Sequence, residues 1–139
     1  MNQAMAKFHI LIVDDSAGLR RALKHLLTTN SDDWVICGEA TDGIDALKKA
    51  AELIPDIILL DLSIPLLHGL EVAKSLKRDF AHVRILIMSE QDPSALSPIA
   101  VEAGVRYCIS KSRLAIDLIP MLRSLVGDLT IGDGISTKP

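Results

Sequence analysis

Few aromatic residues and no long apolar run are the first features of this sequence. Only 3% of its 139 residues are aromatic while 49% are hydrophobic, so a core must be built from Leu, Ile, Val and Ala. No apolar run reaches the roughly 18 residues of a membrane-spanning helix, and the N-terminus lacks the apolar region of a signal peptide. The net charge of −3 argues against the strongly basic surface of a nucleic-acid-binding domain. These absences predict one globular domain in the cytoplasm, with no membrane partner.

Cysteines and nucleotide-binding motifs are also scarce. Cys37 and Cys108 lie in strand-like segments without the spacing of a metal site, which predicts buried free thiols in a reducing compartment rather than a disulfide. Neither GxGxxG nor GxxxxGK[ST] occurs, so nucleotide binding is not expected.

Short apolar runs alternate with amphipathic stretches five times along the chain. The predicted strands are Phe8 to Val13, Trp34 to Ala40, Asp56 to Asp61, Val83 to Met88 and Val105 to Ile109. Repeated alternation of strand and helix predicts an α/β fold, a parallel sheet with right-handed crossovers and helices on both faces.

Capping residues and prolines suggest where helices begin and end. Ser16 is a predicted N-cap of the first helix. Pro98 predicts a short or distorted fourth helix, whereas Pro120 fits the first turn of a last helix capped by Asp117. The glycine-rich segment from Gly127 predicts a flexible tail or linker, which divides the chain into a domain of residues 1–126 and a tail of residues 127–139.

Polar residues stand where the predicted strands end. Asp14 and Asp15 follow the first strand, Asp61 closes the third, Ser89 follows the fourth and Lys111 follows the fifth. Parallel strands point the same way, so these residues should meet at the edge where open α/β sheets bind ligands. Three neighbouring carboxylates repel one another and require a cation, and Mg²⁺ prefers oxygen ligands of this kind. The sequence therefore predicts a site for a divalent metal and a phosphoryl group.

The motifs ILIVDDS, IILLDLSIPLLHG, LIMSE and AGVRYCISK resemble the receiver domain of two-component response regulators. The resemblance covers about Phe8 to Val126. Its most specific part is Asp61 followed four residues later by Pro65 and eight later by Gly69, together with the serine and lysine at the strand ends. It implies a flavodoxin-like fold with a five-stranded parallel sheet in the order 2-1-3-4-5.

The resemblance also implies a role for each matched residue. Asp61 corresponds to the phosphoacceptor, which forms an acyl phosphate. Asp14, Asp15 and Asp61, with the backbone carbonyl of Ser63, correspond to the ligands of Mg²⁺ or Mn²⁺. Ser89 and Lys111 correspond to the hydroxyl and the ammonium that bind the phosphoryl group.

The partners implied are a histidine kinase or a histidine phosphotransfer protein. A homodimer through the face of the fourth and fifth helices, and a DNA-binding output domain absent from this sequence, are further expectations. Such a domain would catalyse only its own phosphorylation and dephosphorylation, so it is not expected to be an enzyme acting on a metabolite. Two alternatives remain open: a degenerate receiver that acts only by protein contact, and a haloacid-dehalogenase-type phosphatase, which expects an Asp-x-Asp pattern after the first strand.

Three positions depart from the family pattern. Cys108 stands where the family commonly has an aromatic residue, and Tyr107, one residue earlier, should point to the opposite side of the strand. The aromatic switch of the family is therefore expected to be absent. Glu90 replaces a usually small residue and could hinder access to Asp61, and Ser112 replaces a common proline.

Overall fold

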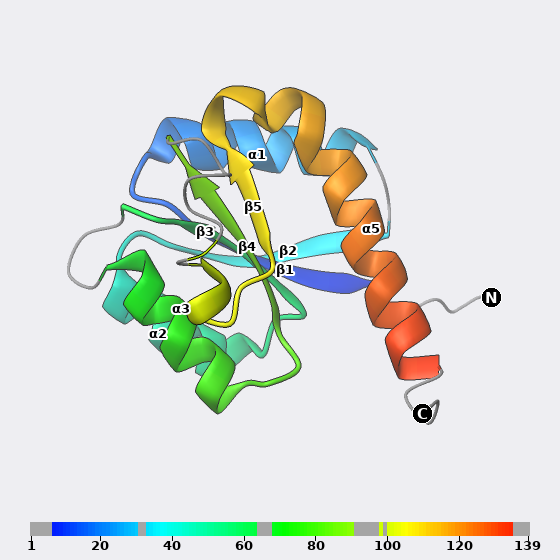
Figure 1. The fold of residues 1–139 in the computed structure, drawn as a ribbon. Helices are drawn as coiled ribbons and strands as arrows, with labels where there is room; N and C mark the ends of the chain where they lie inside the picture. The colour runs from blue at the N-terminus through cyan, green and yellow to red at the C-terminus, as the bar shows by residue number, and fades with distance from the viewer. Residues whose placement is uncertain (1–6, 31–32, 64–67, 91–97, 99, 135–139) are drawn as a thin grey trace.

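The computed structural model describes residues 7–30, 33–63, 68–90, 98 and 100–134, which form one five-stranded parallel sheet between two layers of helices (Figure 1). The strand order is β2-β1-β3-β4-β5, which confirms the predicted fold class and order. The elements are β1 (Phe8–Val13), α1 (Ala17–Asn30), β2 (Trp34–Ala40), α2 (Gly43–Leu53), β3 (Ile57–Asp61), α3 (Gly69–Asp79), β4 (Arg84–Ser89), β5 (Tyr107–Ser110), the 3₁₀ turn η1 (Lys111–Arg113) and α5 (Leu114–Gly134).

The sheet is apolar on both faces because helices cover each side. Ile10 and Ile12 of β1 pack in the cluster that includes buried leucines of α1 and α5. Leu11 and Val13 point the other way, into the cluster that α2 and α3 complete. All four side chains are fully buried, as expected for a central strand of a parallel sheet. None of the described helices combines the length and apolar character needed to cross a bilayer.

A bulge interrupts β2 at Cys37. Ile10 pairs with Ile36, but Leu11 pairs with Gly38, so one residue of β2 has no partner in β1. An extra residue reverses which face the following side chains occupy. Ile36 packs with the α1 and α5 cluster, whereas Ala40, four residues later, packs with the opposite cluster. The bulge thus turns the intervening Glu39 toward α1.

Helix α5 differs from the prediction at both ends. It begins at Leu114, directly after η1, so the predicted N-cap at Asp117 is wrong. Pro120 lies inside the helix on its exposed side, while the helix packs through the buried residues Leu114, Leu118, Leu122 and Leu125. Burial of this stripe outweighs the loss of one backbone hydrogen bond at the proline. The helix continues to Gly134, so residues 127–134, assigned to a flexible tail from the sequence, are helical.

The fourth helix lies largely outside the described residues. Pro98 and residues 100–102 are helical, and residues 91–97 and 99 are not described. The predicted distortion around Pro98 therefore stays a prediction.

Candidate functional site

The carboxyl ends of four strands bring the predicted site residues together. Asp14 follows β1 directly, Asp61 is the last residue of β3, Ser89 is the last residue of β4, and Lys111 follows β5. Asp14, Asp61 and Ser89 are 0%, 1% and 4% exposed, and they are the only buried polar or charged residues in the part of the chain that the structure describes. Buried carboxylates require charged or hydrogen-bonding partners.

Lys111 provides that partner for two of the carboxylates. Its Nζ lies 3.0 Å from Oδ2 of Asp14 and 3.1 Å from Oδ1 of Asp61. Burial alone would lower the pKa of the Lys111 ammonium, but its contacts with the two carboxylates outweigh burial and raise the pKa above its ordinary value. The lysine is therefore charged at neutral pH and links the ends of β1 and β3.

Two hydrogen bonds hold Asp14 in place, one through its backbone and one through its side chain. Its N–H donates to the carbonyl of Ala40 at 3.0 Å, and its Oδ1 accepts from the N–H of Ser16 at 2.8 Å. The Oγ of Ser16 accepts from the N–H of Leu19 at 3.1 Å, which confirms Ser16 as the N-cap of α1. These hydrogen bonds thus hold the turn after β1, which carries Asp14 and Asp15, in one conformation.

An oxygen-only cluster suited to a divalent cation forms at this edge. Asp14, Asp15 and Asp61 each offer a carboxylate oxygen, and these atoms all lie within 4.8 Å of one another. Oδ2 of Asp14 is buried and accepts no hydrogen bond, so its one described polar contact is the ion pair with Lys111. A hard cation satisfies such an oxygen, and the donor set fits Mg²⁺ or Mn²⁺.

Ser63, in the turn after β3, forms hydrogen bonds with the carboxylate of Asp61. Its N–H and its Oγ donate to Oδ1 of Asp61 at 3.2 and 3.3 Å. The same oxygen thus accepts two hydrogen bonds from Ser63 and forms the ion pair with Lys111. The assignment of the Ser63 carbonyl as a metal ligand stays a prediction.

A pocket of about 250 Å³ lies where the turn after Asp61 meets the end of β4, with room for a small anion and its waters. Its lining includes the hydroxyl-bearing residues Ser63 and Ser89 and the side chains of His68 and Glu90. Nδ1 of His68 accepts from the N–H of Leu70 at 3.1 Å and so caps α3. Glu90 is exposed at this pocket, where its negative charge would oppose an approaching anion.

The surroundings of Gly69 explain why a glycine stands eight residues after Asp61. Its N–H donates to the carbonyl of Leu62 at 3.1 Å. A Cβ at this position would lie 2.7 Å from both Cα and O of Leu62 and 2.9 Å from the carbonyl oxygen of Asp61. Only glycine permits α3 to start so close to the backbone of the acceptor turn.

Tyr107 and Cys108 point to opposite sides of β5, as the sequence predicted. Tyr107 packs with the α1 and α5 cluster, and Cys108 packs with the α2 and α3 cluster. Register between β4 and β5 is continuous through both residues. Cys37 and Cys108 are both free thiols and only partly buried, and burial raises the pKa of each.

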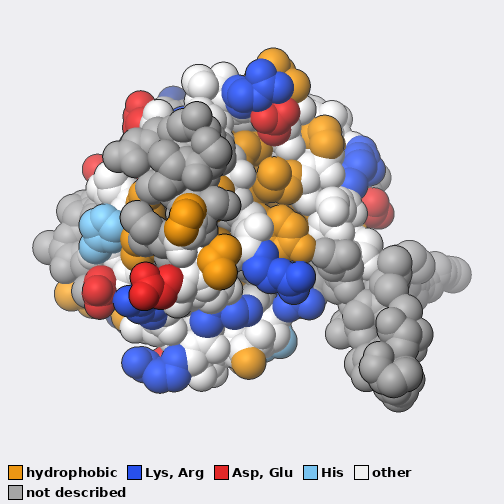
Figure 2. Space-filling model, viewed as in Figure 1, with side chains coloured by type: hydrophobic (Ala, Val, Ile, Leu, Met, Phe, Trp, Pro, Cys, Tyr) orange, Lys and Arg blue, Asp and Glu red, His pale blue; other side chains and the backbone are white. Residues whose placement is uncertain are grey.

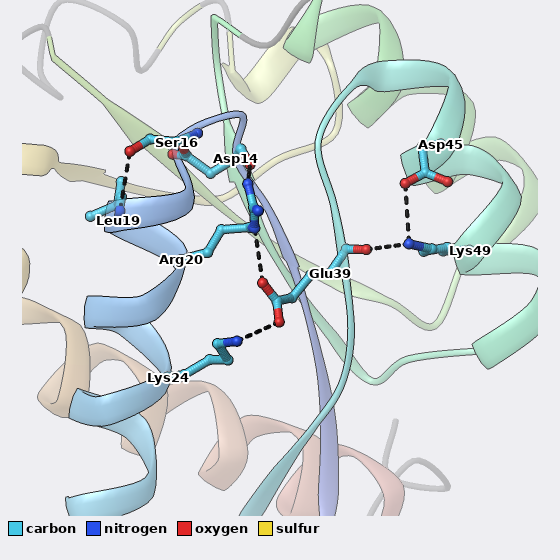
Figure 3. Close-up of polar contacts among 8 residues, drawn as sticks. All are labelled: Asp14, Ser16, Leu19, Arg20, Lys24, Glu39, Asp45 and Lys49. Carbon is cyan, nitrogen blue, oxygen red and sulfur yellow. Dashed lines mark hydrogen bonds and ion pairs between the residues drawn. The ribbon is translucent and has the colours of Figure 1, made fainter.

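Two further residues at the site were not predicted. Nη1 of Arg20 donates to the backbone carbonyl of Asp14 at 2.8 Å, and Nε of Arg20 donates to Glu39 at 2.8 Å (Figure 3). No motif marks this pair in the sequence, because the contact depends on the bulge in β2.

Comparison with known proteins gives a consistent result. A sequence model of the response regulator receiver domain matches residues 10–123. The protein-glutamate methylesterase/protein-glutamine glutaminase 5 of Myxococcus xanthus is 37% identical over 108 residues, which are 77% of this chain and 31% of that relative. The chemotaxis protein CheY of Thermotoga maritima is 33% identical over 102 residues, 73% of this chain and 83% of the relative.

A solved structure agrees with these relatives. The response regulator domain of Thermotoga maritima CheB is 29% identical, with a TM-score of 0.78 over 88% of this chain and 98% of that chain. The chain thus spans less than a third of the methylesterase but most of the chemotaxis protein.

Proposed function

This chain belongs to the response regulator receiver domain family, and we propose that it accepts a phosphoryl group on Asp61 from a histidine kinase or a histidine phosphotransfer protein in a Mg²⁺-dependent reaction. The observation that supports this most is the Lys111 ammonium, which lies within 3.1 Å of Asp61 and 3.0 Å of Asp14 beside an acidic cluster. A degenerate receiver would not need this buried arrangement. The family match also favours a receiver over a haloacid-dehalogenase-type phosphatase.

The transfer uses Asp61 as the nucleophile. A carboxylate oxygen of Asp61 forms a bond to phosphorus while the P–N bond to the donor histidine breaks, and the imidazole nitrogen leaves with the electron pair. Lys111 neutralises charge on the acceptor side, and the hydroxyl of Ser89 would donate a hydrogen bond to a phosphoryl oxygen without adding charge. A divalent cation held by Asp14, Asp15, Asp61 and the Ser63 carbonyl would supply further neutralisation of the transferring oxygens.

Phosphorylation would change which groups Lys111 holds. The phosphoryl group carries about −1.5 to −2 units of charge. It replaces the single negative charge of the Asp61 carboxylate, next to an ammonium already shared by two carboxylates. The ammonium and the Ser89 hydroxyl would reorient toward the phosphoryl group, and this local change would reach the segment after β4. Identical NMR spectra of that segment in the free and phosphorylated forms would contradict the switch.

The donor would dock in a groove between α1 and η1–α5. The groove has a volume of about 560 Å³. Leucines and alanines of both helices line it, together with the polar residues His25, Thr29, Lys111 and Ser112. It thus connects an apolar surface to the acceptor site, as a helix presenting a phosphohistidine requires. Ala22 lies in this lining and is exposed, so it allows close approach of a partner helix.

Ala22→Arg tests this docking surface. It should slow transfer from a phosphorylated histidine phosphotransfer domain at least 10-fold, because the new side chain blocks the groove. Phosphorylation by acetyl phosphate should stay unchanged. Thr28→Arg, an exposed position on α1 outside the groove, is the matched control.

Output would pass through the face formed by α5 and the helical residues before β5. Val101 and Ile116 on this face are 66% and 62% exposed, and Figure 2 shows hydrophobic side chains among basic ones over this region. We propose that a second copy of the chain covers them after phosphorylation. Light scattering with and without acetyl phosphate tests this, and Ile116→Glu should keep the phosphorylated chain monomeric. A DNA-binding domain following this segment stays a proposal.

The decisive experiment is the intact mass after incubation with acetyl phosphate and Mg²⁺. A gain of about 80 Da, the mass of one phosphoryl group, is expected in the wild type. The gain should be absent in Asp61→Asn and in the wild type with excess EDTA. Equal phosphorylation of Asp61→Asn would remove Asp61 as the acceptor, and no gain in the wild type under any condition would favour the degenerate receiver.

A further inference from the structure

The peptide between the two acidic residues is held by an arginine from outside the acidic cluster. Nη1 of Arg20 donates to the backbone carbonyl of Asp14 at 2.8 Å (Figure 3). That carbonyl belongs to the peptide that joins Asp14 to Asp15, so this hydrogen bond fixes the orientation of the peptide plane. The direction in which each carboxylate leaves the backbone depends on that plane.

The guanidinium is itself aligned by Glu39. Nε of Arg20 lies 2.8 Å from Oε1 of Glu39, and Nζ of Lys24 lies 2.7 Å from Oε2. The backbone carbonyl of Glu39 accepts from Lys49 of α2 (Figure 3). Residues of α1 therefore hold the side chain of Glu39, and Lys49 of α2 holds its backbone.

These contacts leave Arg20 little freedom. Its side chain is 16% exposed in its pair with Glu39, whereas Lys24 is 42% exposed. The planar guanidinium uses Nε for the carboxylate and Nη1 for the peptide carbonyl, which a lysine ammonium cannot do with the same geometry. Glu39 also offsets the positive charge that would otherwise oppose a cation at the acidic cluster.

We propose that Arg20 is a positioning residue for the metal site, acting through the peptide between Asp14 and Asp15, with Glu39 holding it in place. This inference rests on the proposed function, because it assumes that the acidic cluster binds a divalent cation. Residues that orient metal ligands without touching the metal affect affinity strongly in other proteins. Arg20 is such a residue here, contributed by α1 rather than by a strand end.

Because Arg20 is charged, electrostatics and positioning predict opposite changes in metal affinity when it is replaced. Arg20→Gln removes a positive charge near a cation site, so electrostatics alone predicts tighter metal binding. Positioning predicts the opposite, a loss of roughly 10-fold in affinity. Lys24→Gln is the matched control, because it removes the same charge and the other ion pair to Glu39 one turn along α1 but does not contact Asp14.

Mn²⁺ affinity, measured from the EPR signal of free Mn²⁺ without any phosphodonor, provides the readout. Weaker binding by Arg20→Gln, with Lys24→Gln equal to or slightly tighter than the wild type, supports the inference. Arg20→Lys keeps the charge but not the two-sided contact, so it should also bind weakly, and it decides the question if Arg20→Gln does not fold. Wild-type or tighter binding by the folded Arg20 variants overturns the inference alone. No Mn²⁺ binding by the wild type overturns the proposed metal site as well.

Discussion

Replacing Gly69 by alanine tests the closeness of α3 to the acceptor turn. The added Cβ would lie 2.7 Å from Cα and O of Leu62 and 2.9 Å from O of Asp61. Carbon atoms in contact normally stand about 3.5–4.0 Å apart, so the methyl group overlaps the turn by about an ångström. All three atoms belong to the backbone and cannot move aside as a side chain could. We therefore expect Gly69→Ala to reduce the free energy of unfolding by about 1–3 kcal/mol, as overpacking does elsewhere.

Urea unfolding followed by circular dichroism measures this change, and Gly127→Ala is the control. A Cβ at Gly127, inside α5, meets nothing within 4 Å, so alanine there should stabilise the domain by about 0.5–1 kcal/mol through helix propensity. The two substitutions are chemically identical and should have opposite signs. Because the clash involves the acceptor turn, Gly69→Ala should also slow phosphorylation of Asp61 by acetyl phosphate. A Gly69→Ala protein as stable as the wild type would refute the reasoning.

Three further results are expected. Glu90→Ala should speed phosphorylation by acetyl phosphate at least twofold, measured from intact mass against time, and the gain should shrink at high salt because the repulsion of the anion is screened. Lys111→Met should leave Asp14 and Asp61 without their shared cation, and the free energy of unfolding at pH 7 should fall by about 3 kcal/mol in urea titrations. The ion pair with Lys24, joined by that with Arg20, lowers the pKa of Glu39 against the effect of burial. The contribution of these ion pairs is present above the ordinary pKa of a glutamate, near 4.3, and is lost as the pH falls through the lowered pKa. The stability difference between the wild type and Glu39→Gln should therefore shrink as the pH falls below about 4.3.

The edge of the sheet that holds the site was predictable from the sequence. Asp14, Asp61, Ser89 and Lys111 each follow or close an apolar run, and parallel strands must bring their carboxyl ends to one side. Residue types and strand direction are local properties of the chain, so no tertiary information was needed. The strand order itself came from the family resemblance, since alternation of strands and helices alone does not specify it.

The start of α5 and the contact of Arg20 with Glu39 depend on tertiary packing and were not predictable. Local rules place Pro120 in a first turn, but Pro120 faces solvent and the buried leucine stripe extends the helix back to Leu114. For Glu39, strict alternation along β2 predicts the opposite face. The bulge at Cys37 reverses which face of the sheet the following side chains occupy. The local sequence contains no signal that predicts this unpaired residue.

Because of the proline inside α5, a small bend in this helix can move its C-terminal end by a larger distance. Pro120 has no N–H to donate to the carbonyl of Ile116, and a helix that lacks one such bond bends more easily there. The segment from Pro120 to Gly134 is about 21 Å long at 1.5 Å per residue, and its last turns stand clear of the sheet (Figure 1). A tilt of only about 5° at Pro120 would move Gly134 by about 2 Å. The buried residues Leu122 and Leu125 lie close to the bend and would move by less than about 1 Å, so the displacement is largest where the C-terminal turns meet another surface.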